Sequence, residues 1–214
     1  ARLLAPLGRV YARATARRLA DRAGVRVGVP VICVGNLSVG GTGKTPTVVA
    51  LVQRLAARGV FAHVVSRGYG GSLSGPVRVD ERRHSAADVG DEPLLLAGFT
   101  PTRGAPDRAA RARAAAAAGA GAILLDDGPT LAKDRSLIVV EAGRGFGNGL
   151  CLPAGPLREP VAAGLRRADF VLSIGSAPQQ AEFARAWGAA LTVPHLTGAL
   201  KPLETGMDWE RLPV

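Results

Sequence analysis

The chain has few aromatic residues and few cysteines. Aromatic residues make up 4% of its 214 residues, so Ala, Val and Leu must form most of the core of a chain that is 47% hydrophobic. The two cysteines, Cys33 and Cys151, form no metal or redox motif. Cys33 falls in an apolar run, where we expect a buried thiol in a reducing, cytoplasmic compartment. No run is long and apolar enough to span a bilayer, and no signal peptide is recognisable.

The chain is strongly basic, but it has almost no lysine. Its formal net charge is +10 and its sequence pI is about 11.1, which raises nucleic acid and anionic membranes as partners. Lysine occurs only at 44, 133 and 201; the remaining basic residues are arginines scattered among Ala and Gly. No aromatic residues are interleaved with them as stacking platforms for bases. We therefore expect no nucleic-acid partner.

Residues 2–23 have the pattern of a basic amphipathic helix. Leu3, Leu4, Leu7 and Val10 alternate with a series of arginines. Such a helix can lie on an anionic membrane surface, or it can pack on the domain with its arginines in water. Composition alone favours neither alternative.

Apolar runs and helical patterns alternate through most of the remaining sequence, which predicts an α/β fold. The predicted strands are 29–34, 60–65, 76–80, 121–126, 137–141 and 169–174, and the predicted helices are 45–58, 91–98, 107–118 and 177–187. This alternation indicates a mostly parallel sheet with helices on both faces and ligands at the carboxyl ends of the strands. The Gly- and Pro-rich segment 142–160 is expected to be a long ordered or lid-like loop. We divide the chain into an N-terminal helix (1–25), a core (26–175) and the beginning of a linker or further lobe (176–214).

Residues 35–46, GNLSVGGTGKTP, have the composition of a phosphate-binding loop between a strand and a helix. Glycines let successive backbone N–H groups converge on phosphate oxygens, Lys44 would reach the β- and γ-phosphates, and the Thr45 hydroxyl would hold Mg²⁺. The strict pattern has Gly where this chain has Ser38, but Pro46 and the apolar helical pattern behind it support the assignment. A P-loop NTPase-like core is therefore predicted, with the nucleotide held by Ser38, Val39, Gly40, Gly41, Thr42, Gly43, Lys44 and Thr45.

Acidic residues lie at the ends of two predicted strands and at the start of one predicted helix. Asp126 and Asp127 end an apolar strand, which is how P-loop enzymes present a carboxylate to Mg²⁺, and Glu141 ends another. The alternative for the pair is a simple Asp-Gly turn; otherwise two adjacent carboxylates need a cation or an Arg nearby. Asp91, in GDEP, opens a predicted helix, and by itself it is better explained as an N-cap.

Three further blocks are patterned too strongly for plain linkers. SRGYGG places Arg67 and Tyr69 among glycines, which is typical of a loop that admits an anionic ligand closely. RGFGNG begins at residue 144, and LPAGPLREP spans residues 152–160. A flexible turn would explain the glycines of SRGYGG, but not its Arg and Tyr together.

The ordered set GNLSVGGTGKTP, SRGYGG, GDEP, DDG, RGFGNG and LPAGPLREP resembles the tetraacyldisaccharide 4'-kinases of lipid A biosynthesis. The resemblance runs from the basic N-terminal helix to about residue 174, and this family also has Ser at the position of Ser38. It implies ATP- and Mg²⁺-dependent phosphorylation of the 4'-hydroxyl of an acylated glucosamine disaccharide 1-phosphate. It also implies a peripheral location on the cytoplasmic face of the bacterial inner membrane, on an anionic surface, with no obligate protein partner.

The resemblance assigns roles by position. Ser38–Thr45 would hold ATP, Thr45, Asp127 and Glu141 would lie on the metal side, and Asp126 is a weaker candidate. Asp91 would be the base that accepts the proton of the sugar hydroxyl, with Lys44 as the other catalytic residue. Arg67 and Tyr69 would face the acceptor or the phosphates.

The chain departs from the family in two respects. The family usually continues DDG with an aromatic residue, Gln and His, whereas this chain has Pro129, Thr130 and Leu131. The family also has a second lobe with a His that partners the catalytic Asp; none of His63, His84 and His195 matches it, so the chain looks truncated. The alternatives are a catalytically impaired nucleotide-binding module and a regulatory P-loop ATPase. From position, His63 is expected in the core, His84 at the surface and His195 in a late strand or loop.

Overall fold

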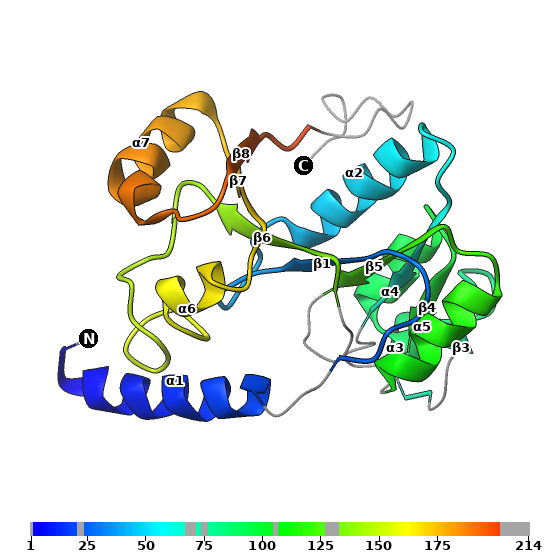
Figure 1. Ribbon diagram of the computed structural model, residues 1–214, viewed down its shortest axis with the longest axis horizontal. Coiled ribbons are helices and arrows are strands. Elements are labelled where there is room, and N and C mark those ends of the chain that lie inside the picture. The colour runs from blue at the N-terminus through cyan, green and yellow to red at the C-terminus, as the bar shows by residue number, and fades with distance from the viewer. Residues whose placement is uncertain are drawn as a thin grey trace, which may run out of the picture.

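The computed structural model describes residues 2–20, 24–66, 72–73, 77–104, 107–126 and 133–201. They form an eight-stranded sheet in the order β3-β4-β2-β5-β1-β6-β7-β8 (Figure 1). All strand pairs are parallel except β3 with β4. The strands are β1 (Val31–Gly35), β2 (Ala62–Val65), β3 (Val77–Arg78), β4 (Thr102–Gly104), β5 (Ala122–Asp126), β6 (Arg135–Glu141), β7 (Phe170–Ile174) and β8 (His195–Gly198).

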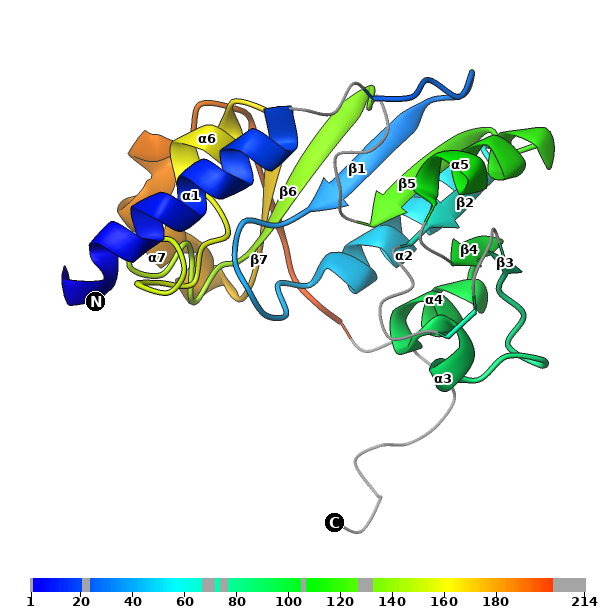
Figure 2. The same cartoon turned by 90° about the horizontal axis from the view of Figure 1, so that it is seen from below.

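Helices cover both faces of this sheet (Figures 1 and 2). The helical elements are η1 (Arg2–Leu4), α1 (Ala5–Ala20), α2 (Lys44–Ala56), α3 (Ala86–Val89), α4 (Asp91–Ala97), α5 (Arg108–Ala117), α6 (Val161–Leu165), α7 (Ala177–Trp187) and η2 (Gly188–Ala190). The helices α2 and α4 pack on one face, whereas α5, α6 and α7 pack on the other. The predicted α/β architecture is thereby confirmed. The short elements β4, α3 and α6 were not predicted, and β8 was expected only as a late strand or loop around His195, since each has five residues or fewer and shows no periodicity over that length.

Small aliphatic residues fill the core, as the scarcity of aromatic residues requires. Val34, Val64 and Leu124, on three adjacent strands, are fully buried beneath Val48 of α2. On the other face, the alanines of α5 pack on Ile123 and its neighbours. Near-continuous apolar strands of this kind are typical of a parallel sheet that is buried on both sides.

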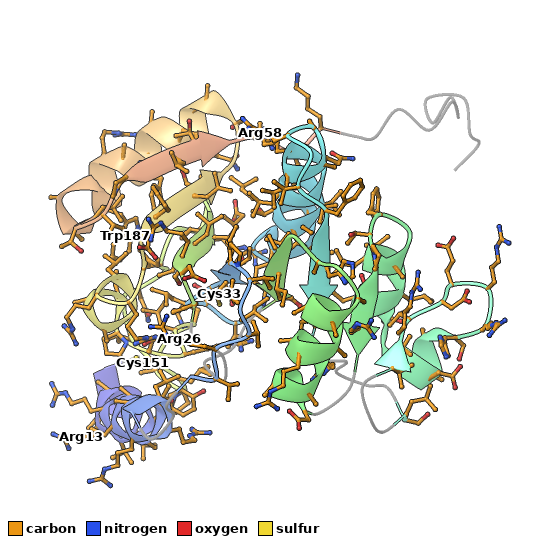
Figure 3. The ribbon with its side chains drawn as sticks, turned by 45° about the vertical axis from the view of Figure 1, so that its right-hand side comes forward. Arg13, Arg26, Cys33, Arg58, Cys151 and Trp187 are labelled. Carbon is orange, nitrogen blue, oxygen red and sulfur yellow. The ribbon has the colours of Figure 1, made fainter. Side chains whose placement is uncertain are left out.

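The helix α1 divides its residues between two unlike sides. Its small residues at helical spacing, Ala5, Gly8 and Ala12, are buried or half-buried. Leu3, Leu7 and Val10 are exposed, at 95%, 56% and 61%. Figure 3 shows Arg13 projecting from α1 at the periphery of the molecule. One side of α1 packs on the protein, as the second alternative expects, and a mixed apolar and basic side remains exposed to solvent. Among the described helices, none has the length and hydropathy needed to span a membrane.

His63 in β2 and Cys33 in β1 are buried as expected, and His195 opens β8. His84 was expected at the surface; it is half-buried, and its Nδ1 accepts the Asp80 N–H. Cys151 is also a buried free thiol. Beyond residue 175, α7 and β8 add a helix and an edge strand to the same sheet.

Candidate active site

The predicted phosphate loop connects β1 to α2, with β1 ending at Gly35 and α2 beginning at Lys44. Gly43 has φ +84°, and a Cβ placed there would lie 2.6 Å from Cδ1 of Ile174. Gly40 has φ +105°, and a Cβ at Gly40 or Gly41 would meet nothing within 4 Å. The positive φ therefore favours glycine at position 43, where Ile174 lies close, whereas Gly40 and Gly41 border open space.

The loop is shaped from within by a buried side chain and is stabilised by a backbone contact. Asn36 is 8% exposed, and its Nδ2 donates to the Ser38 carbonyl at 2.8 Å. The Val39 N–H donates to the Pro156 carbonyl at 2.8 Å. Within the described part of the chain, the N–H groups of Gly40, Gly41, Thr42 and Gly43 have no hydrogen-bond partner. Successive unpaired amides at a helix N-terminus are the donors that bind phosphate oxygens.

Thr45 contacts a carboxylate that sequence reasoning did not single out. Its Oγ1 donates to Oε1 of Glu92 at 2.5 Å, and both side chains are half-buried. Glu92 is the second residue of α4, beside Asp91, which is exposed at the start of that helix. Glu92 belongs to the GDEP block, so the block itself could have indicated it. From the sequence alone, we expect the chemistry of that block at Asp91 instead. A hydroxyl and a carboxylate oxygen together suit a hard divalent cation.

The end of β5 is buried and polar. Asp126 is 3% exposed, and its Oδ2 accepts a hydrogen bond from Ser66 Oγ at 3.4 Å. The Ser66 carbonyl accepts a hydrogen bond from Nη1 of Arg111, which is fully buried. A further bond joins Arg111 Nε to the Asp107 carbonyl at 3.0 Å. From the sequence, we expect either a cation or an arginine near the carboxylates at this strand end. The structure has an arginine, Arg111, which is linked to Asp126 through Ser66.

Glu141, the other predicted metal-side acid, is engaged in its own turn. Its carboxylate accepts the Gly143 N–H at 2.9 Å and the Arg144 N–H at 3.1 Å. The Arg144 guanidinium lies 3.6 Å from the same carboxylate. A cation at Glu141 would compete with these three partners. Across the described residues, no group of three His, Cys, Asp or Glu is arranged to hold a metal ion.

Three predicted site residues, Arg67, Tyr69 and Asp127, lie outside the described residues. The structure therefore brings together the loop from Ser38 to Thr45 with Glu92, and it places Asp91 one residue from that contact.

The LPAGPLREP block lies directly against the phosphate loop. Ser38 and Leu157 form an isolated antiparallel bridge, and the Arg158 N–H donates to the Leu37 carbonyl at 2.7 Å. Leu157 is fully buried. Of the two descriptions expected for residues 142–160, the ordered loop agrees with these contacts.

The RGFGNG block is anchored by aromatic rings. Phe146 is fully buried and packs against Phe183 and Trp187 of α7, with ring centroids 5.9 and 5.1 Å apart. Figure 3 shows Trp187 at this junction. A Cβ at Gly145 would lie 2.5 Å from Trp187 Nε1, and one at Gly147 would lie 2.6 Å from Cγ of Pro156. The glycines of this block serve internal packing.

Comparison with known proteins places the sequence among named relatives. The model of a family described as tetraacyldisaccharide-1-P 4'-kinase matches residues 1–211. A tetraacyldisaccharide 4'-kinase of Dinoroseobacter shibae is 68% identical over 216 residues, covering 99% of this chain and 64% of that protein. One from Jannaschia sp. is 60% identical, covering 99% of this chain and 66% of that protein. The chain thus spans a little under two thirds of the length of these relatives.

Solved structures share the fold at lower identity. An apo form of LpxK from Aquifex aeolicus, described as in complex with ATP, has a TM-score of 0.69 and 22% identity, covering 94% of this chain and 85% of that one. The signal recognition particle receptor FtsY of Elizabethkingia anophelis has a TM-score of 0.50 and 13% identity, covering 94% of this chain and 69% of that one. These likenesses agree with the predicted P-loop NTPase-like architecture.

Proposed function

The chain belongs to the tetraacyldisaccharide-1-P 4'-kinase family, and we propose that the protein carrying it transfers the γ-phosphate of ATP to the 4'-hydroxyl of a tetraacylated glucosamine disaccharide 1-phosphate. The observation that carries this proposal is the run of four unpaired amides from Gly40 to Gly43, placed immediately before Lys44 and Thr45. The named relatives support the choice of acceptor.

In this proposal, the residues from Ser38 to Thr45 bind the triphosphate. The amides of the loop donate to phosphate oxygens, and Lys44 places its ammonium against the β- and γ-phosphates. The Val39 N–H is already bound to Pro156, which leaves the donors from Gly40 onward for the nucleotide. Phosphoryl transfer depends chiefly on positioning and charge neutralisation, so this loop supplies most of what the donor needs.

Mg²⁺ would be held by Thr45 together with carboxylates. When bound there, Mg²⁺ would supply positive charge that neutralises the transferred phosphoryl group. Glu92 fits this role through its contact with Thr45. Asp127 and Glu141 are the further ligands of this proposal, and Glu141 would have to exchange its turn contacts for the ion. Mg²⁺ commonly keeps several waters, so the pair of Thr45 and Glu92 needs few further protein ligands.

The acceptor hydroxyl would approach from the side of α4. Asp91 is exposed at the first residue of α4 and adjoins Glu92, so its carboxylate is accessible to accept the proton of the attacking hydroxyl. Arg67 and Tyr69 are proposed to bind the acceptor or its phosphate. No nucleic acid and no obligate protein partner is part of this proposal.

We further propose that α1 rests on an anionic membrane surface at the cytoplasmic face of the inner membrane. Its exposed Leu3, Leu7 and Val10 recur at spacings of four and three, which places them on one side, with Arg13 and Arg17 also exposed. In the proposed division of the chain, residues 1–25 form this helix, 26–175 the kinase core and 176–214 the beginning of a linker to a further lobe, although α7 and β8 still pack with the sheet of the core. Replacing both Leu7 and Val10 by Ser should reduce flotation with anionic vesicles, whereas Ala16→Ser should not. Equal flotation of the wild type, the double variant and Ala16→Ser would refute the proposed membrane contact of α1.

The kinase assignment is tested by Lys44→Ala in the full-length protein. We expect the rate of ATP-dependent transfer to the disaccharide acceptor to fall by at least about 100-fold, because a cation at the transferred phosphate is lost. The matched control is Lys133→Ala, since Lys133 contacts Ser136 near the amino end of β6. Transfer that survives Lys44→Ala unchanged would overturn the loop assignment, and a wild-type protein that binds ATP without transfer would favour the impaired nucleotide-binding module.

A further inference from the structure

One segment, Leu150–Arg158, contacts both the phosphate loop and α1. On the loop side, Leu157 bridges Ser38, and two backbone hydrogen bonds join Val39 to Pro156 and Arg158 to Leu37. These contacts flank the first residue of the proposed nucleotide cradle. The position of this segment therefore determines where the phosphate loop begins.

The segment is also tied together internally. The Leu157 N–H donates to the Leu150 carbonyl at 3.1 Å, and the Leu152 N–H donates back to the Leu157 carbonyl at 2.9 Å. The Cys151 carbonyl accepts the N–H groups of both Ala154 and Gly155. A shift of Cys151 would thus be transmitted through this turn to Leu157, which is fully buried and has no room to adjust independently.

On its other side the segment meets α1 at a glycine. Gly8 is buried, and a Cβ placed there would lie 2.8 Å from the Cys151 carbonyl oxygen and 3.5 Å from Cβ of Ala154. Figure 3 shows Cys151 beside α1. A cavity of about 170 Å³ beside this contact is lined by Ala5, Gly8 and Ala12 of α1 together with Cys151 and Ala154. The close approach of α1 therefore depends on Gly8 having no side chain.

We propose that Gly8 is a positioning residue for the phosphate loop, acting through Cys151 and Leu157. The proposal rests on the nucleotide-binding role assigned above to Ser38–Thr45. The side of α1 opposite Gly8 is the one proposed to face the membrane, so a single helix would both contact the lipid surface and hold the nucleotide loop in place.

The test is Gly8→Ala in the full-length protein, measured by calorimetric titration with Mg·ATP in the absence of lipid. Because Ala favours a helix interior more than Gly, α1 itself should not be weakened. The added Cβ must displace the Cys151 carbonyl, and we expect the Kd for ATP and the KM for ATP to rise about 3- to 10-fold while kcat at saturating ATP changes little. Hydrogen exchange at the Val39 amide should become faster.

Two controls separate this effect from general destabilisation. Gly188→Ala makes the same chemical change where a Cβ would meet nothing within 4 Å, and Ala16→Ser alters α1 at an exposed position. Neither should change the Kd for ATP. If Gly8→Ala fails to fold, Ala12→Ser, at the same contact one turn further along α1, replaces it and should raise the Kd by a smaller factor.

An unchanged Kd and unchanged Val39 exchange in folded Gly8→Ala would overturn the positioning role while leaving the kinase assignment intact. An equal rise in the Kd for ATP in Gly8→Ala and Gly188→Ala would overturn the positioning role as well. Failure of the wild-type protein to bind ATP would instead contradict the nucleotide-binding role itself, so the two failures are distinguishable.

Discussion

The two glycine-rich segments of the chain, the phosphate loop at 38–45 and the turn at 143–149, use the same residue for opposite purposes. At Gly40 and Gly41 an added Cβ would meet nothing, and the neighbouring amides are unpaired. At Gly145 and Gly147 an added Cβ would collide with Trp187 and Pro156. Glycine makes space for a ligand in the first segment and lets protein atoms fill that space in the second.

This difference shows that glycine content by itself does not identify a ligand loop. Both segments contain glycines with positive φ, and both follow a buried strand at the carboxyl edge of the sheet. What separates them is the element that follows. The phosphate loop is followed by α2, whose N-terminus adds electrostatic attraction for anions, whereas the turn at 143–149 packs under the aromatic residues of α7.

The largest expected effect comes from removing the aromatic anchor of the second segment. Phe146→Ala should lower the free energy of unfolding by about 3–5 kcal/mol, because a fully buried ring leaves a cavity that its neighbours cannot fill. Chemical denaturation measures this loss, and Phe146→Leu, which retains much of the volume, serves as the control. If Phe146→Ala lost less unfolding free energy than Phe146→Leu, the turn at 143–149 would not be held by this ring.

Gly145→Ala should act mainly on stability. The positive φ of this position and the collision of the added Cβ with Trp187 together should lower the free energy of unfolding by about 2–4 kcal/mol. Thermal unfolding would show this loss as a lower midpoint. The KM for ATP, measured well below the unfolding temperature, should change less than in any phosphate-loop variant. A large rise in that KM without loss of stability would assign the second segment to ligand binding after all.

Gly40→Ala should show the reverse pattern. Because nothing lies within 4 Å of the added Cβ, the stability loss should be limited to the strain of positive φ, about 1–2 kcal/mol. The loop amides must keep this conformation to bind phosphate, so relaxation of the strain should raise the Kd for ATP about 10-fold, equivalent to about 1.4 kcal/mol. Gly59→Ala, also at positive φ in open space but at the end of α2, is the control for strain without ligand binding.

Sequence reasoning located the elements whose physical signals are local. The apolar strands, α2 and the phosphate loop have periodicity or composition that needs no knowledge of neighbours, and all were predicted close to their observed positions. The contact of Glu92 with Thr45 joins residues 47 apart, and the bridge between Ser38 and Leu157 joins two loops, so neither has a local signature. The metal-side role of Glu141 rests on the family resemblance, since a single carboxylate at a strand end is weak evidence by itself; here that carboxylate also accepts N–H groups of its own turn.

The smallest expected effect concerns His63, which lies outside both glycine segments. Its influence on the pH dependence of stability should therefore be the same in the variants of either segment. His63 is buried in β2; burial, followed by the charges of Arg103 and Arg78, lowers its pKa. The folded state therefore favours the neutral imidazole, and below about pH 6.5 the unfolded chain binds more protons than the folded one. Stability should be full above that pH and fall as the pH drops from about 6.5 toward the lowered pKa.

His63→Gln should flatten the fall in the unfolding midpoint between about pH 6.5 and 5, because its side chain takes up no proton in this range. Since His63 contributes to neither glycine segment, Gly145→Ala and Gly40→Ala should keep the wild-type slope although their midpoints differ. A slope that persists in His63→Gln would mean that another group governs the acid response.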